Sequence, residues 1–202
     1  MAVVLGTNSG FVSVAPTVDP AGTDTVADSR QHTSNDTSPS TATKVVEMGW
    51  WCNDATEESN FEVGLYAADG TDGKAGTLLF SSVTNAKGTG SGWKSATVDW
   101  SISPSTSYWL AFQLDNTATT TNTNFSATGG TGRLSNNPRT TLLSPYSGEI
   151  AYNSVGMVCV YAVWEAASGP ANLKTYNTNP VANVKTINTN PIANVKSLNT
   201  NV

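Results

Sequence analysis

The stretch KVVEMGWWCN, residues 44–53, decides the fold class. Its apolar side chains recur at every second position, at Val46, Met48, Trp50 and Cys52. A period of two is that of a half-buried β-strand, because successive side chains of a strand point to opposite faces of the sheet. The stretch therefore predicts a strand whose even-numbered residues face the core, with Trp51 on the opposite face.

Further strand signals lie on both sides of this stretch. They are NFEVGLYA (60–67), TLLFSSV (77–83), SGWKSATVDW (91–100), YWLAFQLD (108–115) and VGMVCVYAVW (155–164), with weaker signals at 124–127 and 132–134. The last of the strong segments is apolar on both faces, which is typical of a central strand. About eight to ten strands joined by turns predict an all-β fold, an antiparallel β-sandwich of the jelly-roll type.

Composition and charge exclude several classes of protein. Only 12% of the 202 residues are charged, and Thr, Ser, Asn, Gly and Ala predominate, which disfavours long amphipathic helices. The net charge of −5 disfavours nucleic acid as a partner, because such binding needs a basic footprint. We find no apolar run of about 18 residues and no secretory signal pattern, so we expect no membrane partner. The absence of a signal fits a viral structural protein, because such a protein leaves the cell by lysis.

The chain changes character near residue 166. We expect an N-terminal arm with edge strands at 1–42, a sandwich domain at 43–165, a linker at 166–171 and a repetitive tail at 172–202. The tail repeats NLKTYNTNPVA, NVKTINTNPIA and NVKSLNTNV with a period of eleven residues. Proline and the Asn-Thr-Asn breaks disfavour a helix, so short strands broken by turns fit the repeat better.

The tail is the predicted oligomerisation element. Each repeat offers an apolar pair: Leu173 with Tyr176, Val184 with Ile187, and Val195 with Leu198. A lone strand has no partner for its backbone groups, so repeats in a regular register favour pairing with another chain. Three lysines give the tail a charge of +3, and the remaining seven basic and fifteen acidic residues give the body −8. We expect a homotrimer.

The candidate sites for chemistry are few. Cys52 and Cys159 can form a disulfide across a long loop or remain two buried thiols, and the sequence leaves both alternatives open. The single histidine, His32, lies in the polar run QHTSNDTS and is expected to be a solvated loop residue. Without a base held by a third group, no hydrolase arrangement is indicated. We predict that the chain is not an enzyme and that no residue is catalytic.

Two other groups of residues have both a structural and a functional interpretation. Asp69 and Asp72 in ADGTDG can ligate calcium through closely spaced oxygens, although a simple Gly-Asp turn also explains them. Trp51 and Trp109 are expected on outer faces of the sandwich. There they are either covered by a loop or the arm, or available to stack on a glycan or a neighbouring subunit.

Taken together, the stretches GWWCNDATEESNFEVGLYAADG, GTLLFSS, GSGWKSATVDW and YWLAFQLDNT resemble a β-sandwich module of uncharacterised phage structural and bacterial surface proteins. The VKTIN-type units of the tail resemble C-terminal repeats of phage virion proteins. The resemblance covers about residues 44–202 and carries no catalytic residues to transfer. It implies a structural protein in the virion of a tailed phage, as a capsid decoration, tail or fibre component, with itself and other virion proteins as partners. The alternative is a carbohydrate-binding or adhesive module on a bacterial surface or extracellular fibre, with glycans as partners.

Overall fold

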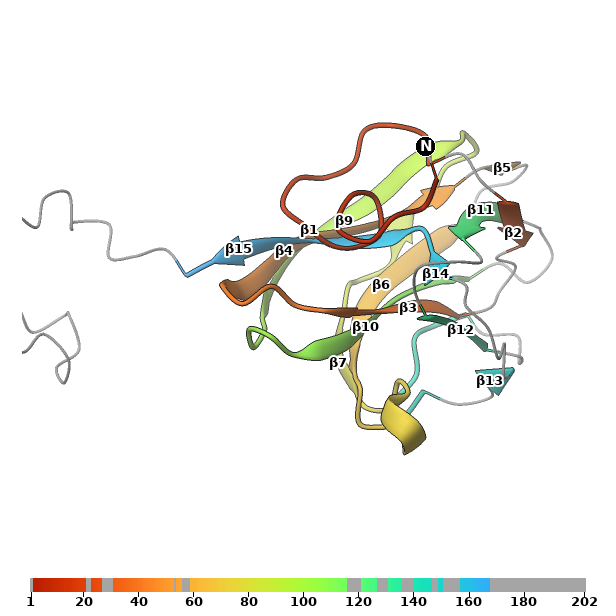
Figure 1. Ribbon diagram of the computed structural model, residues 1–202. Coiled ribbons are helices and arrows are strands. Elements are labelled where there is room, and N and C mark those ends of the chain that lie inside the picture. The colour runs from red at the N-terminus through yellow and green to blue at the C-terminus, as the bar shows by residue number, and fades with distance from the viewer. Residues whose placement is uncertain are drawn as a thin grey trace, which may run out of the picture. The chain divides into compact units, whose positions relative to one another are not determined.

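The computed structural model describes residues 2–20, 23–26, 31–52, 54–55, 59–115, 121–126, 131–135, 140–146, 149–150 and 157–167. These residues form an all-β fold, as predicted, with strands in two main sheets and mostly antiparallel pairing (Figure 1). The one helical element within these ranges is a short 3-10 turn, η1, at Thr71–Gly73. No helix of the described part is long and apolar enough to cross a bilayer.

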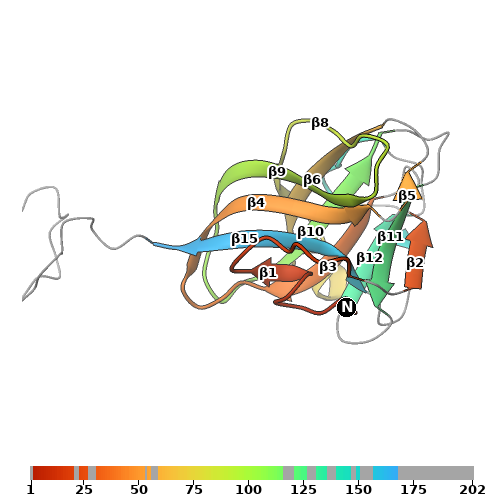
Figure 2. The same cartoon turned by 90° about the horizontal axis from the view of Figure 1, so that it is seen from above.

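Sheet I contains four strands. Figure 2 shows them side by side. Their order is β1 (Gly10–Val12), β15 (Val160–Ala166), β4 (Ala42–Cys52) and β9 (Gly92–Ser101). The strand β1 runs parallel to β15, and the other two pairs are antiparallel. Consequently β1 and β9 are the two edges of this sheet.

Sheet II is larger and faces sheet I. Its order is β13 (Glu149–Ile150), β12 (Thr131–Ser135), β3 (His32–Thr37), β10 (Ser107–Leu114), β6 (Asn60–Ala67) and β7 (Leu78–Ser81), with β8 (Asn85–Ala86) also on β6. A small sheet III has the order β14 (Met157–Val158), β11 (Thr121–Ser126) and β2 (Thr23–Val26), with β5 (Asp54–Ala55) on β11.

The main core fills the space between sheets I and II. It is built from alternate residues of the long strands, including Met48, Trp50 and Cys52 of β4, Phe61, Val63 and Leu65 of β6, and Tyr108, Leu110, Phe112 and Leu114 of β10. These are the faces that the period of two predicted. Trp50 stacks on Phe112 across the sheets, with ring centroids 4.5 Å apart.

The alternation fails at one position of β4. Val46 was expected in the core, but Val45 is the fully buried core residue and Val46 is half-buried. The pairing register of β4 shifts at this point against both of its neighbours, β9 and β15. A bulge of this kind adds a residue to one strand and moves the next side chains to the other face. The prediction for Val46 was therefore wrong.

Further apolar clusters cover the outer faces of both sheets. On sheet II, Tyr66, Ala75, Trp109, Ala111, Leu142 and Tyr146 pack under the segments that follow β6 and precede β13. On sheet I, Val3 and Leu5 of the N-terminal segment pack with Trp51, Trp93 and Cys159. Figure 1 shows this N-terminal segment, in red, arching over sheet I.

The N-terminal region is more than an arm with edge strands. The strand β1 lies at an edge, as expected, but β3 lies between β12 and β10 inside sheet II. The predicted long strand at 155–164 is also divided at Cys159, since β14 belongs to sheet III and β15 to sheet I. The chain separates into a compact unit of residues 1–167 and a second unit of residues 168–202. The predicted tail strands lie outside the described residues.

Candidate interaction surfaces

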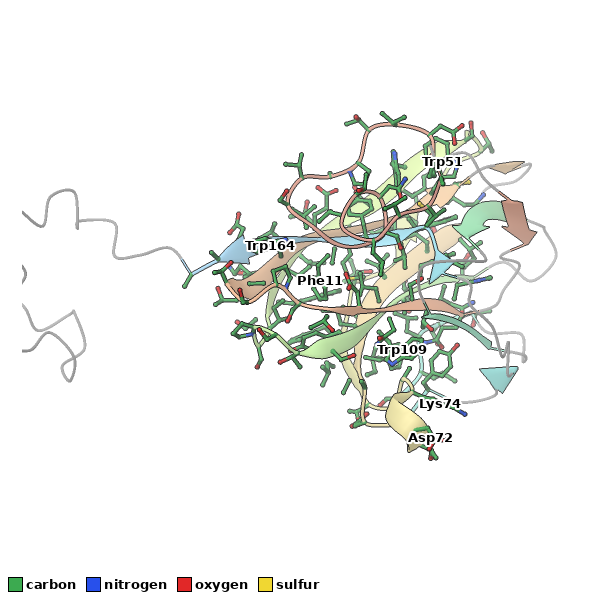
Figure 3. All side chains as sticks on the ribbon, in the orientation of Figure 1. Phe11, Trp51, Asp72, Lys74, Trp109 and Trp164 are labelled. Carbon is green, nitrogen blue, oxygen red and sulfur yellow. The ribbon has the colours of Figure 1, made fainter. Side chains whose placement is uncertain are left out.

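Both tryptophans predicted on outer faces are there, and both are covered by the protein's own chain. Trp51 is 9% exposed and packs edge-to-face against Trp93, with centroids 5.3 Å apart. Trp109 is 3% exposed, and its Nε1 donates a hydrogen bond to the carbonyl oxygen of Gly73 at 3.0 Å. Figure 3 labels both side chains. Neither ring offers an open platform for a sugar, because stacking needs an exposed aromatic face.

The two cysteines are buried free thiols in this structure. Cys52 belongs to the core between the sheets, whereas Cys159 packs with Val3 and Trp51 on the outer side of sheet I. Their side chains therefore point to opposite faces of one sheet. Of the two alternatives left open by the sequence, the structure has two separate thiols and not a disulfide. The Cys159 Sγ donates to the carbonyl oxygen of Asn8 at 3.1 Å. Burial raises the pKa of this thiol, which makes it a poor nucleophile.

The prediction for His32 was wrong. His32 is the first residue of β3, is 1% exposed, and stacks on Phe112 with centroids 5.0 Å apart and planes 8° from parallel. It therefore extends the Trp50–Phe112 stack of the core. A ring held inside the core in this way has a packing role, and it is not placed at a surface where a substrate could reach it.

The Gly-Asp turn after β6 uses Asp69 as a cap. The two carboxylate oxygens of Asp69 accept hydrogen bonds from Thr77, from its backbone N at 2.7 Å and its Oγ1 at 2.6 Å. These bonds lower the pKa of Asp69. Asp72 lies in the exposed turn η1 with a positive φ of 59°, near Lys74 (Figure 3). Within the described residues, no group of three His, Cys, Asp or Glu side chains is placed to hold a metal. Calcium at Asp69 and Asp72 stays a prediction.

At the β1 edge of sheet I, a half-buried carboxylate accepts a hydrogen bond from one backbone N–H of the edge strand. Asp36 of β3 accepts hydrogen bonds from the backbone N of Phe11 and of Thr37, both at 2.8 Å. Gly10 makes this possible, because it has a φ of +72° and a Cβ there would lie 2.2 Å from the Asp36 Oδ2. Asp36 thereby joins sheet II to the edge strand of sheet I.

We expect Asp36→Asn to lower the free energy of unfolding by about 1–2 kcal/mol, because an amide nitrogen would replace one of two acceptor oxygens. Burial raises the pKa of Asp36 more than its two backbone hydrogen bonds lower it. A carboxyl that binds its proton more tightly when folded contributes less stability as the pH rises from its ordinary pKa through its folded-state pKa. Urea unfolding of both proteins from acidic to neutral pH checks this. The stability of the wild type minus that of the variant should fall as pH rises, and a difference that grows would contradict it.

The second edge of sheet I is the strand β9. In the part of the chain that the structure describes, no strand pairs with the side of β9 that faces away from β4. The outer-face residues Ser95, Thr97 and Asp99 are exposed, and Trp93 is half-buried. A salt bridge of 2.5 Å joins Asp99 to Lys44 of β4.

Sheet II also ends on this side of the sandwich. Phe80 of its edge strand β7 stacks on Trp100 of β9, with centroids 5.5 Å apart. Nearby in the chain, Leu79 is 41% exposed and Val83 is 81% exposed. The two sheet edges and these apolar side chains make this side the candidate interaction surface.

Comparison with protein-family models, with curated proteins and with solved structures finds no match. The case for a function therefore depends on the chain's own geometry. Sequence reasoning identified the strand at 91–100 but not its place at an edge. Its alternation of small polar residues with Ala96 and Val98 indicates one solvent-facing side, which edge strands and central strands of an antiparallel sheet can share. The apolar tail residues Leu173 to Leu198 lie outside the described residues.

Proposed function

We propose that this chain is a non-enzymatic structural protein of a tailed-phage virion, a capsid decoration, tail or fibre component, which assembles with itself through its C-terminal repeats. The observation that carries the proposal is the junction at residue 167. A compact body with its own core ends there, and three copies of an eleven-residue unit follow. Such units have no core of their own, so their regular spacing is best explained by pairing with other chains.

Charge supports association between copies. The body carries −8 and the tail +3, so tails are attracted to the bodies of neighbours. The attraction is weak and should decline with salt, because exposed charges are screened over about 8 Å at physiological ionic strength. A homotrimer is the proposed state, with other virion proteins as further partners.

The rival function, a carbohydrate-binding or adhesive module, has less support. Its candidate contacts were Trp51 and Trp109, and their own chain covers both. Glycan binding through either ring would first require removal of the N-terminal segment or of the segment around Gly73.

A chain that ends after Ala167 tests the proposal. The cut keeps β15 complete, since its last residue, Ala166, still pairs with Ala42. We expect the shortened protein to be a monomer in sedimentation velocity and to unfold cooperatively, with a free energy of unfolding within about 0.5 kcal/mol of the full chain. The full chain should form the larger species and should co-purify with capsids or tails. The same size for both proteins would refute assembly through the tail.

A further inference from the structure

We propose that the open edge of β9 accepts a strand from the C-terminal repeat of a second copy of this chain. The inference rests on the proposed function and adds the surface to which the tail binds. Strand addition to a sheet edge is a common mode of recognition, in which backbone hydrogen bonds give affinity and alternate side chains give specificity.

The edge is regular over a length that suits one repeat. From Gly92 to Thr97, β9 pairs with β4 without a register shift, and the irregularity comes only beyond Thr97. An edge strand presents a row of N–H and C=O groups on its unpaired side. The six residues from Gly92 to Thr97 therefore form a straight acceptor, and each repeat offers a strand of about four residues before its Asn-Thr-Asn break.

The two faces of β9 differ in chemistry. Ala96, Val98 and Trp100 face the core, whereas Ser95, Thr97 and Asp99 face the solvent. Two acidic residues lie on the solvent face. Asp99 is 76% exposed and would share an incoming cation with Lys44, to which it forms a salt bridge, and Glu47 of β4 pairs with Thr97. An added strand should thus place an apolar residue beside Val98 on the inner face, and a cation beside Asp99 and an apolar residue beside Trp93 on the outer face.

The repeats have this pattern. In VKTI, a period of two places Val184 and Thr186 on one face and Lys185 and Ile187 on the other. The other repeats keep the same order, with Leu173, Lys174, Thr175 and Tyr176 in the first and Val195, Lys196, Ser197 and Leu198 in the third. All three units are therefore equivalent as added strands.

One antiparallel register places the lysine and both apolar residues of a repeat beside suitable partners. If Lys185 lies opposite Thr97, then Ile187 lies opposite Ser95, and Val184 lies opposite Val98, the first residue beyond the regular stretch. Diagonal neighbours on one face of a sheet also interact, which brings Lys185 toward Asp99 and Ile187 toward the half-buried ring of Trp93. The inner apolar residue continues the face of Val98, which packs against the core.

The occupant is a tail from another copy, as the proposed self-assembly requires. Each chain carries three equivalent repeats and a single β9. Since each body has one such edge, one unit per chain is enough to fill every β9 edge in the assembly.

A charge exchange in the full chain tests the inference. We expect Thr97→Lys to weaken self-association about fivefold in sedimentation equilibrium, because it sets two lysines across the new strand pair. Replacing Lys174, Lys185 and Lys196 by Glu should also weaken association, through repulsion from Asp99 and Glu47. Combining both changes should restore it. The matched control is Thr71→Lys, the same substitution at an exposed residue of η1, which should change nothing.

The outcomes separate this inference from the proposed function. Restored association in the combined variant supports the edge of β9 as the acceptor. If Thr97→Lys behaves like Thr71→Lys while removal of residues 168–202 still reduces the size, the acceptor is wrong and tail-mediated assembly stands. If removal of the tail leaves the size unchanged, both fail. Hydrogen-exchange protection of β9 by the tail in a species that stays monomeric would overturn the assignment to a second copy.

Discussion

Replacing Trp50 by alanine should lower the free energy of unfolding by about 4 kcal/mol. Trp50 is fully buried between the sheets, where its ring stacks on Phe112 and meets the edge of Phe61 at 6.1 Å. Removal of the ring takes away this contact area and leaves a cavity bounded by two β-strands that cannot collapse freely. Since domains of this size are stable by only about 5–15 kcal/mol, the loss should be a large fraction of the total. Urea unfolding measures it.

Trp164→Ala is the matched control. Trp164 is half-buried near the end of β15, where it packs at the margin of the same core (Figure 3). Its truncation removes less buried area, so we expect under half of the effect of Trp50→Ala. Equal losses for the two variants would contradict the central position of Trp50.

Gly49→Ala should destabilise the protein by about 2–3 kcal/mol, although it adds only one methyl group. A Cβ at Gly49 would lie 2.6 Å from the carbonyl oxygen of Lys94 and 2.7 Å from the Tyr161 hydroxyl. The first is backbone of the neighbouring strand β9, and the second donates a hydrogen bond of 2.5 Å to the Glu47 Oε1. Relief of the clash must therefore displace a strand or break this bond. Thermal and urea unfolding of the variant check the prediction.

Gly90→Ala provides the comparison for this substitution. A Cβ at Gly90 would have no heavy atom within 4 Å. Alanine there should leave the stability unchanged or raise it slightly, because it restricts the unfolded chain. If the two glycine variants had the same stability, the close approach at Gly49 would not be a real constraint.

The core faces could be predicted from the sequence where strands are long and regular. The alternation in 60–67 and 108–115 placed Phe61, Leu65 and Phe112 inside and Trp109 outside, as the structure has them. One face of these strands meets the opposite sheet, so apolar and polar residues alternate along their sequence with a period of two. At Val46 the bulge interrupts the period, and a bulge leaves no mark in composition.

The polar strand β3 could not be found in this way. Its sequence HTSNDT has no apolar residue, yet Thr33 and Ser34 are fully buried. The Ser34 Oγ accepts a hydrogen bond from the backbone N of Val158 at 2.9 Å, so this hydroxyl is satisfied inside the protein. Buried polar groups need such partners, and the partner here is more than a hundred residues away in the chain. Local sequence patterns do not contain that information.

Of the two parts of the proposed contact, only the tail could be predicted from the sequence. Repetition and charge marked residues 172–202 directly, but the open edge of β9 depends on which strands become neighbours. Strand order is a property of the whole fold, and the segment at 91–100 would read the same in the centre of a sheet or at its edge.

The parallel pairing of β1 with β15 has a consequence for folding kinetics. Gly10 pairs with Tyr161, and the Ser9 Oγ donates to the carbonyl oxygen of Val158 across 149 positions of the chain. Because β15 also separates β1 from β4, the last strand of the body to be synthesised fills the middle of sheet I. Such high contact order slows folding. On the ribosome, β4 keeps a bare edge until residues 160–166 emerge, so the nascent chain is exposed to strand-mediated aggregation until nearly the whole body has been made.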